Sequence, residues 1–162
     1  MHMQQFTVSG LAIDSVNDSP VVLLKELDGD RVIPVWIGPA EANAIALRLA
    51  EVEPPRPLTH DLLQRVIEGV GLTVQRVVIT DLQDHTFFAE VVLEGQGTVT
   101  RIDARPSDSI ALALRTSAPI FVADHVFEEE FGVHPTDDPE RHDRLRQRLE
   151  RIDPESFGDL PL

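Results

Sequence analysis

The fold is decided by two stretches of the sequence, Val32-Ile-Pro-Val-Trp-Ile-Gly-Pro-Ala-Glu-Ala-Asn-Ala-Ile-Ala-Leu-Arg48 and Val99-Thr-Arg-Ile-Asp-Ala-Arg-Pro-Ser-Asp-Ser-Ile-Ala-Leu-Ala-Leu-Arg115. They align without a gap when Pro39 is placed on Pro106. In each stretch a strand-like segment ends at a proline, which fits the first position of a helix because that position needs no N–H donor. An acid follows two residues later, Glu41 or Asp108, where the positive end of a helix favours it. Both stretches therefore predict a strand that leads into a helix.

The same alignment relates the segments that precede the two stretches. The predicted strands are 4–16, 21–27 and 32–37 in the first copy and 73–82, 86–93 and 99–104 in the second. A further helix, Thr59–Glu68, stands between the copies, and a short strand, Pro119–Val122, follows the second. Because hairpin turns join the strands, we predict an α+β domain with antiparallel sheet, packed helices and an internal β-β-β-helix pseudo-repeat. The alternative is chance similarity between two alanine-rich helices.

Local features refine this prediction. Gly10 interrupts the apolar spacing of the first strand, so a β-bulge is expected there. Pro34 lies inside the third strand and has no N–H, which predicts a sheet edge or a bulge. Thr59 is predicted to cap the middle helix. The buried stripe of that helix is predicted to consist of Leu62, Leu63, Val66 and Ile67.

The domain is expected to span residues 1–132. Residues 133–162 are predicted to form an acidic linker and an arginine-rich C-terminal helix, Glu140–Ile152. The apolar stripe of this helix is sparse, with only Leu145, Leu149 and Ile152. The tail is therefore expected to add little to the core.

The charge balance restricts the classes of function. The 162 residues include 14 Lys and Arg against 28 Asp and Glu, a formal net charge of −14. This charge repels polyanions, whereas dedicated duplex-DNA binders usually have a domain pI above about 9. The absence of cysteine excludes disulfides, thiolate metal sites and thiol catalysis. The sequence has neither an apolar run long enough for a membrane span nor a secretory signal, so a cytoplasmic location is expected.

Three segments together resemble the bifunctional nuclease domain family: Ile33-Pro-Val-Trp-Ile-Gly-Pro-Ala-Glu-Ala42, Arg56-Pro-Leu-Thr-His-Asp-Leu62 and Ile102-Asp-Ala-Arg-Pro-Ser-Asp-Ser-Ile-Ala-Leu-Ala-Leu-Arg115. The resemblance runs from about residue 4 to residue 132, and the block Asp103-Ala-Arg-Pro-Ser-Asp108 is its most specific part. It implies an α+β fold, self-association as a homo-oligomer and nuclease activity on DNA and RNA. We therefore expect single-stranded or structured nucleic acid as a partner and no membrane.

The residues supply candidates for metal-assisted phosphodiester hydrolysis, which needs carboxylates to hold Mg²⁺ or Mn²⁺. Asp103 ends a strand and Asp108 begins the next helix, while Glu41 occupies the equivalent place in the first copy; these three are the predicted metal ligands. The predicted catalytic residues are Asp103, Asp108, Arg105 and His60. Arg56 and Arg105 each precede a proline, which favours an extended backbone and aims each guanidinium at phosphate as a substrate-binding group. No organic cofactor is expected.

Each candidate also has a structural explanation. Glu41, Asp108 and Asp61 are typical acids of a first helical turn, and His60 is typical of an exposed one. An ion pair of Arg105 with Asp103, Asp108 or Glu41 would equally hold the strand–helix corner together. The sequence therefore leaves two hypotheses: a nuclease-like enzyme with a divalent cation, or a non-catalytic homo-oligomeric binding or regulatory module whose polar corner is structural.

Overall fold

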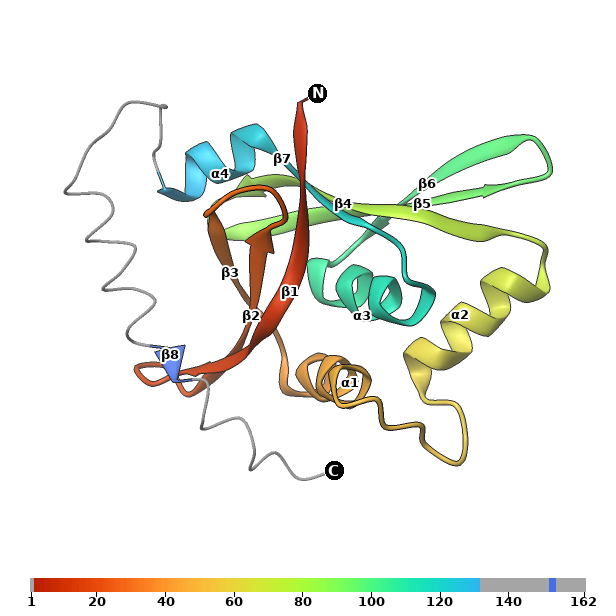
Figure 1. Ribbon diagram of the computed structural model, residues 1–162, viewed down its shortest axis with the longest axis horizontal. Helices are drawn as coiled ribbons and strands as arrows, with labels where there is room; N and C mark the ends of the chain where they lie inside the picture. Colours follow the sequence, from red (N-terminus) through yellow and green to blue (C-terminus); the bar gives the residue numbers. More distant parts are fainter. Residues whose placement is uncertain (1, 132–151, 154–162) are drawn as a thin grey trace.

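The computed structural model describes residues 2–131 and 152–153. The strands are β1 (Met3–Asp14), β2 (Ser19–Glu26), β3 (Val32–Trp36), β4 (Thr73–Gln83), β5 (Thr86–Gly95), β6 (Thr98–Ala104), β7 (Ile120–Ala123) and β8 (Ile152–Asp153). The helices are α1 (Pro39–Leu49), α2 (Thr59–Gly69), α3 (Pro106–Thr116) and α4 (Asp124–Phe131). The strands form one sheet in the order β3-β2-β1-β7-β4-β5-β6, with β8 beside β1 (Figure 1). The predicted α+β class is confirmed.

The internal repeat is visible in the strand order. β3 and β6 are the two edges, and each pairs antiparallel with the middle strand of its own copy. β7 lies between the copies, antiparallel to β1 and parallel to β4, where Val77–Ile79 are in register with Ile120–Val122. The other strand pairs are antiparallel, and β7 can lie parallel to β4 because the chain crosses over through α3 to reach the centre of the sheet.

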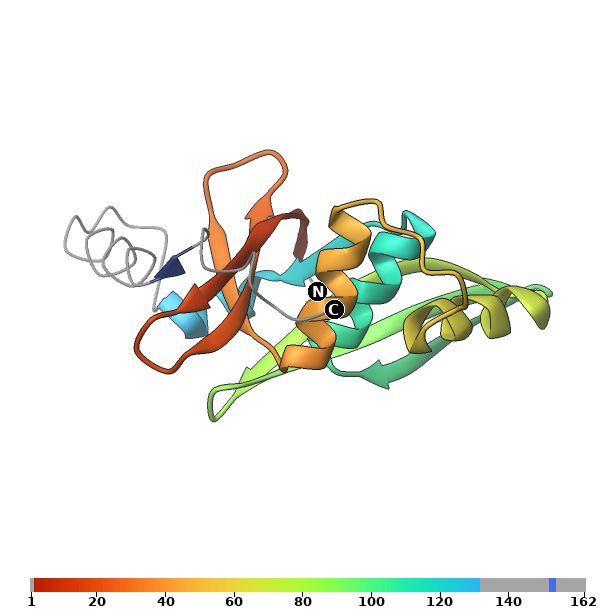
Figure 2. The ribbon, with the colours of Figure 1, turned by 90° about the horizontal axis from the view of Figure 1, so that it is seen from below.

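The apolar core lies where α1 and α3 pack on the sheet and on each other (Figure 2). Both copies contribute fully buried side chains, among them Leu24, Ile33, Ile45, Val77, Ile79, Ile110 and Leu112. Burial of a side chain of this size contributes about 1.5–3 kcal/mol relative to exposure. The two copies thus fold around one shared core.

Several local predictions are confirmed. The β1–β2 register shifts between Val8 and Gly10, which is the expected bulge. Pro34 lies in β3 at the edge of the sheet, where a missing N–H breaks no ladder on the outer side. Pro39 and Pro106 stand in the first positions of α1 and α3.

Helix α2 departs from prediction in two ways. Its N-cap is Leu58 and not Thr59, because the Asp61 carboxylate accepts the Leu58 N–H at 2.8 Å and closes the first turn. Its apolar stripe is not buried: only Ile67 is, whereas Leu62, Leu63 and Val66 are exposed. α2 packs on α3, and the rest of its apolar face has no covering layer among the described residues.

In the C-terminal segment, the structure corrects one end of the predicted helix and does not test the rest of it. Most of the predicted helix Glu140–Ile152 lies outside the described residues. Ile152 itself is in β8, which pairs with β1 at Ile13 and Asp14, so it is not helical. The acidic stretch from Asp124 contains an additional helix, α4, because Val126 and Phe127 are buried against the sheet. None of the helices between residues 2 and 131 has both the length and the apolar character that a membrane crossing requires.

Candidate functional site

A polar corner forms where the first turns of three helices meet. Glu41 lies in the first turn of α1, His60 in that of α2 and Asp108 in that of α3, with Arg105 directly before α3. Arg105 Nη2 donates to Glu41 Oε1 at 2.8 Å, and Arg105 Nε donates to Asp108 Oδ2 at 2.9 Å. Arg105 therefore bridges the two acids that are equivalent in the repeat. We call Glu41, His60, Arg105 and Asp108 the polar corner.

His60 and Asp108 form a hydrogen-bonded pair. The distance between His60 Nε2 and Asp108 Oδ1 is 2.9 Å, and the His60 side chain is only 12% exposed. Partial burial raises the pKa of the Asp108 carboxyl, but hydrogen bonds from His60 and Arg105 and the charge of Arg105 outweigh it, so the net pKa is lower than usual. The carboxylate thus stays ionised and orients the imidazole. His60 Nδ1 has no hydrogen-bond partner among the described residues.

A second charged pair holds α2 in place. Arg115 Nε donates to Asp61 Oδ1 at 2.7 Å, while its two Nη atoms donate to the carbonyl oxygens of Ala111 and Ala44. The Arg115 side chain is only 4% exposed. These bonds join α1, α2 and α3. Asp61 and Arg115 thereby fix the first turn of α2, which carries His60, relative to the other two helices. The role of Arg115 was not predicted from the sequence. The sequence signal for it is that Arg115 is the single cation in the predicted helix Ser107–Arg115, which is mainly apolar after its first turn.

Asp103 and Arg56 do not join the contacts of the polar corner, although Asp103 lines the groove into which the corner opens. Asp103 lies opposite Glu90 in the β5–β6 register, and Arg105 pairs with Glu41 and Asp108 instead of with Asp103. The Asp103 carboxylate is exposed and has no ion-pair partner among the described residues. Arg56 lies exposed on the proline-rich connector and does not line the groove at the corner.

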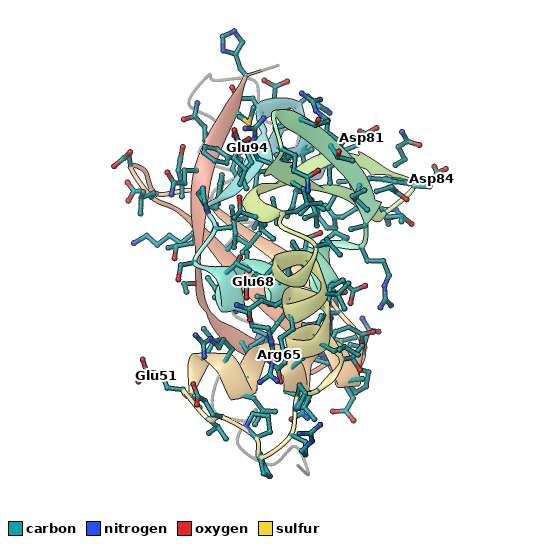
Figure 3. All side chains as sticks on the ribbon, turned by 90° about the vertical axis from the view of Figure 1, so that its right-hand side faces the viewer. Glu51, Arg65, Glu68, Asp81, Asp84 and Glu94 are labelled. Atoms are coloured by element: carbon teal, nitrogen blue, oxygen red, sulfur yellow. The ribbon has the colours of Figure 1, made fainter. Side chains whose placement is uncertain are left out.

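An open groove of about 1240 Å³ leads away from the polar corner. All four residues of the polar corner line its polar end. Its walls are otherwise mainly apolar and come from α2, β5 and β6, including Leu62, Leu63, Val66, Val91, Leu93 and Ile102. In Figure 3, the labels of Arg65 and Glu68 mark α2, with Arg65 nearer than Glu68 to α1. The corner can therefore take a polar or anionic group, with an extended ligand along the groove.

The predicted metal ligands do not form a prepared site. No group of three or more His, Cys, Asp or Glu residues in the described part of the chain is arranged to hold a metal ion. Both oxygens of Asp108 are taken by His60 and Arg105, and Glu41 is paired with Arg105. Asp103 lines the same groove as these two acids and shares no hydrogen-bond or ion-pair partner with them among the described residues. The residues as placed do not fit a resident divalent cation held by Asp103, Asp108 and Glu41.

Comparison with known proteins identifies the family. The model of the family described as bifunctional nuclease domain matches residues 22–134. The chain belongs to the bifunctional nuclease domain family. The matched part of this bifunctional nuclease domain contains α1, α2 and α3 and thus every residue of the polar corner.

Relatives of this bifunctional nuclease domain occur in bacteria and plants. An uncharacterised protein of Mycobacterium tuberculosis is 38% identical over 164 residues, which cover 96% of this chain and 98% of the relative. Bifunctional nuclease 1 of Oryza sativa subsp. japonica is 26% identical over 112 residues, 67% of this chain and 34% of the rice protein. Bifunctional nuclease 1 of Arabidopsis thaliana is 26% identical over 107 residues, 64% of this chain and 33% of its own length. The plant proteins thus share only about a third of their length with this chain.

Proposed function

We propose that the polar corner cleaves phosphodiester bonds in DNA and RNA. The observation that carries this proposal is the His60–Asp108 pair at the end of the groove, with His60 Nδ1 unpaired among the described residues. A carboxylate that holds one imidazole nitrogen leaves the other basic and stabilises the imidazolium that forms on protonation. The membership of the bifunctional nuclease domain family supports the same class of reaction.

The residues suggest a role for each group. His60 Nδ1 takes the proton of an attacking water, whose oxygen forms the new bond to phosphorus while the bond to the leaving oxygen breaks. The leaving oxygen then takes a proton from solvent. Arg105 is 66% exposed and its Nη1 has no partner among the described residues, so its guanidinium is available for a phosphate oxygen. Asp108 holds both His60 and Arg105 and is a positioning residue.

Involvement of Mg²⁺ or Mn²⁺ remains part of the proposal. Nucleic acid must approach a chain with a net charge of −14, and a cation would reduce that repulsion. Because Glu41, Asp103 and Asp108 present no ready site, we derive no step through a metal. Cleavage in Mg²⁺, in Mn²⁺ and in EDTA separates a required cation from one that merely screens charge.

The experiment uses the full chain with end-labelled single-stranded DNA and RNA. His60→Asn is expected to lower the cleavage rate by at least about 100-fold, the usual contribution of a general base. His85→Asn is the matched control, because His85 is exposed and its left-handed backbone (φ 63°) accepts asparagine. Both variants are purified in parallel with the wild type, so that host nucleases affect all samples alike. Equal cleavage by wild type and His60→Asn would show that the polar corner is not the active site.

A non-catalytic binding module is the second candidate. It is favoured by the pairing of Glu41, Arg105, Asp108 and His60 with one another and by the apolar walls of the groove. On this hypothesis Asp108→Asn lowers the free energy of unfolding and leaves any nucleic-acid cleavage in the preparation unchanged. Thermal unfolding of the same samples, measured beside the cleavage rate, decides between the two candidates.

A further inference from the structure

A second pocket, of about 280 Å³, lies between the ends of α1 and α3, the proline-rich connector and α2. Three arginines line it: Arg48 from the last turn of α1, Arg65 from α2 and Arg115 from the last turn of α3. Residues 2–131 contain nine Lys and Arg in all, and three of these nine line this one pocket. Such a gathering of cations stands out in a chain with a net charge of −14. We call it the arginine pocket.

Arg115 adds no net charge to the arginine pocket, because Asp61 neutralises it. Asp61 Oδ1 accepts from Arg115 Nε, and Asp61 Oδ2 accepts from the Leu58 N–H, so both carboxylate oxygens are occupied. Partial burial raises the pKa of the Asp61 carboxyl, but hydrogen bonds from Leu58 and Arg115 and the charges of Arg115 and Arg65 outweigh it, so the net pKa is lower than usual. The pair stays ionised and fixes the three helices around the pocket.

The charges of Arg48 and Arg65 are not neutralised in this way. Arg48 Nε donates to the Leu114 carbonyl oxygen at 3.3 Å, while its two Nη atoms bond to nothing in the described part of the chain. Arg65 is exposed and forms no hydrogen bond or ion pair with any described residue. Glu53, on the rim, is exposed and pairs with no arginine in residues 2–131. With three arginines against two acids, the lining has a formal charge of +1.

Stabilisation of the helices explains two of these arginines and leaves Arg65 over. Arg48 and Arg115 lie in last helical turns, where a cation is favourable. The last turn of α2 contains no basic residue, so Arg65 has no such role. An i,i+4 pair with Asp61 is the usual alternative on a helix, but the Asp61 oxygens are already taken by Arg115 and Leu58. Arg65 is therefore available to a ligand.

The remaining wall of the arginine pocket is rigid and small. Pro54, Pro55 and Pro57 line it, and a proline ring fixes its own backbone torsion and offers no N–H. A wall that is already ordered lowers the entropic cost of binding. Sites for drug-sized molecules usually measure about 300–1,000 Å³, so this pocket suits an anionic group with a small substituent.

We propose that the arginine pocket binds a phosphomonoester group through Arg48 and Arg65. Guanidinium groups donate two parallel hydrogen bonds to phosphate. The terminal oxygens of a phosphomonoester point in three directions, so they can accept from arginines on different helices, whereas the two oxygens of a carboxylate lie in one plane. A phosphomonoester carries a charge of about −1.5 to −2 at neutral pH, which matches two free guanidinium groups better than the single charge of a phosphodiester.

The arginine pocket adjoins the groove. Pro57 and Leu58 line both, whereas His60 lines only the groove and Asp61 only the pocket. The phosphate can thus come from a free phosphomonoester in the pocket alone, or from the end of a nucleic-acid strand that continues past Pro57 and Leu58 into the groove. The chemistry of recognition is the same for both sources.

The test titrates the isotope-labelled full chain and follows its backbone amides by nuclear magnetic resonance. Inorganic phosphate and thymidine 5′-monophosphate are the probes, and thymidine is the control without phosphate. The wild type is expected to bind both probes with a dissociation constant of about 1 mM or lower, as at least two charge-assisted hydrogen bonds provide. The signals that shift are expected to belong to residues that line the arginine pocket. Thymidine is expected to leave them unchanged.

Arg65→Gln and Arg48→Gln are each expected to raise this dissociation constant at least about tenfold, because each removes a charge-assisted donor. Arg56→Gln is the matched control, since Arg56 is an exposed arginine of the same connector that does not line the pocket. Arg105→Gln changes the polar corner instead. Both are expected to bind phosphate at the arginine pocket as the wild type does. Circular dichroism verifies that every variant is folded.

The inference is overturned if neither phosphate probe shifts these signals, or if Arg65→Gln and Arg48→Gln bind phosphate as tightly as Arg56→Gln does. It is also overturned if Arg105→Gln abolishes the binding, because the phosphate then occupies the polar corner. A short single-stranded DNA with a 5′-phosphate separates the two sources. Tighter binding than that of thymidine 5′-monophosphate assigns the pocket to a strand end, and equal or weaker binding assigns it to a free phosphomonoester. None of these results depends on cleavage, so the proposed function is decided separately.

Discussion

β3 and β6 occupy equivalent positions in the two copies of the repeat, yet their environments are opposite. In β3, Ile33 is fully buried and Val35 is 2% exposed. In β6, the equivalent residues Thr100 and Ile102 are exposed. The same strand–helix pattern thus produces one closed edge and one open edge.

The helices explain this difference. α1 packs on β2, the neighbour of β3, and its Ile45 belongs to the same apolar cluster as Ile33 and Val35. α3 packs instead on α1, α2 and the strands β4 and β5, and leaves β6 outside. The helix inserted between the copies, α2, stands across a groove from β6. One copy therefore closes the core, and the other presents the groove with the polar corner at its end.

The largest expected effect comes from the two arginines that are equivalent in the repeat. Arg115→Gln should lower the free energy of unfolding by about 3–5 kcal/mol, because it leaves Asp61 without its buried partner. Arg48→Gln should cost about 1 kcal/mol, since the Arg48 side chain is half-buried and donates one bond, to the Leu114 carbonyl, at 3.3 Å. Urea unfolding followed by circular dichroism measures both. Equal losses in the free energy of unfolding would show that the two equivalent arginines contribute equally to stability.

The next largest expected difference is between the edge strands β3 and β6. Ile33→Ala should lower the free energy of unfolding by about 2–5 kcal/mol, as expected for a fully buried isoleucine. Ile102→Ala should change it by no more than about 0.5 kcal/mol at concentrations where the chain is monomeric. Measuring both variants over a range of protein concentrations sharpens the comparison, because an Ile102 effect that grows with concentration indicates burial between copies.

The polar corner is expected to weaken in acid. The pKa of Asp108 is lower in the folded chain than in the unfolded chain, so the unfolded state binds more protons as the pH falls. The Asp108 contribution is complete above the unfolded pKa of about 3.9 and disappears as the pH falls through the lower, folded value. Asp108→Asn should therefore reduce the dependence of the free energy of unfolding on pH in this range. Urea unfolding at several acid pH values tests this, and an unchanged slope would contradict it.

The smallest expected effect concerns the C-terminal segment. Ending the chain after Gly132 removes β8, whose described contact is a short pairing with β1 at Ile13 and Asp14. The shortened chain is expected to remain folded and to lose no more than about 1 kcal/mol, since few backbone bonds are removed. Calorimetry of both lengths measures the change. A chain that is unfolded after this truncation would mean that residues 133–162 belong to the core.

Much of the fold could be predicted because it follows from local chemistry. Alternation of apolar residues predicted the strands, Pro39 and Pro106 predicted the helix starts, and Pro34 predicted an edge. The repeat then predicted that Glu41 and Asp108 would be equivalent. The family was predicted from the residues around these same corners, and it is confirmed.

The candidate site was predictable only in part. Glu41, His60, Arg105 and Asp108 do meet, as expected for residues next to the corners of a repeat. The partners of Arg105 were not predictable. Asp103 and Asp108 are close to it in sequence and Glu41 is related to Asp108 only by the repeat, so only the approach of α1 to α3 selected Glu41 and Asp108. Arg115 was missed since its value depends on three helices packing around it.

The sequence by itself determined which segments are strands and helices and where prolines begin or limit them. It also determined which residues are equivalent in the two copies. All of these depend on neighbours along the chain. Only the tertiary structure decided that β7 lies between the copies, that the apolar face of α2 stays exposed, and that β6 is left open. An apolar stripe specifies that a face favours burial, but whether it is buried depends on which layer packs against it. That choice is made by the whole chain.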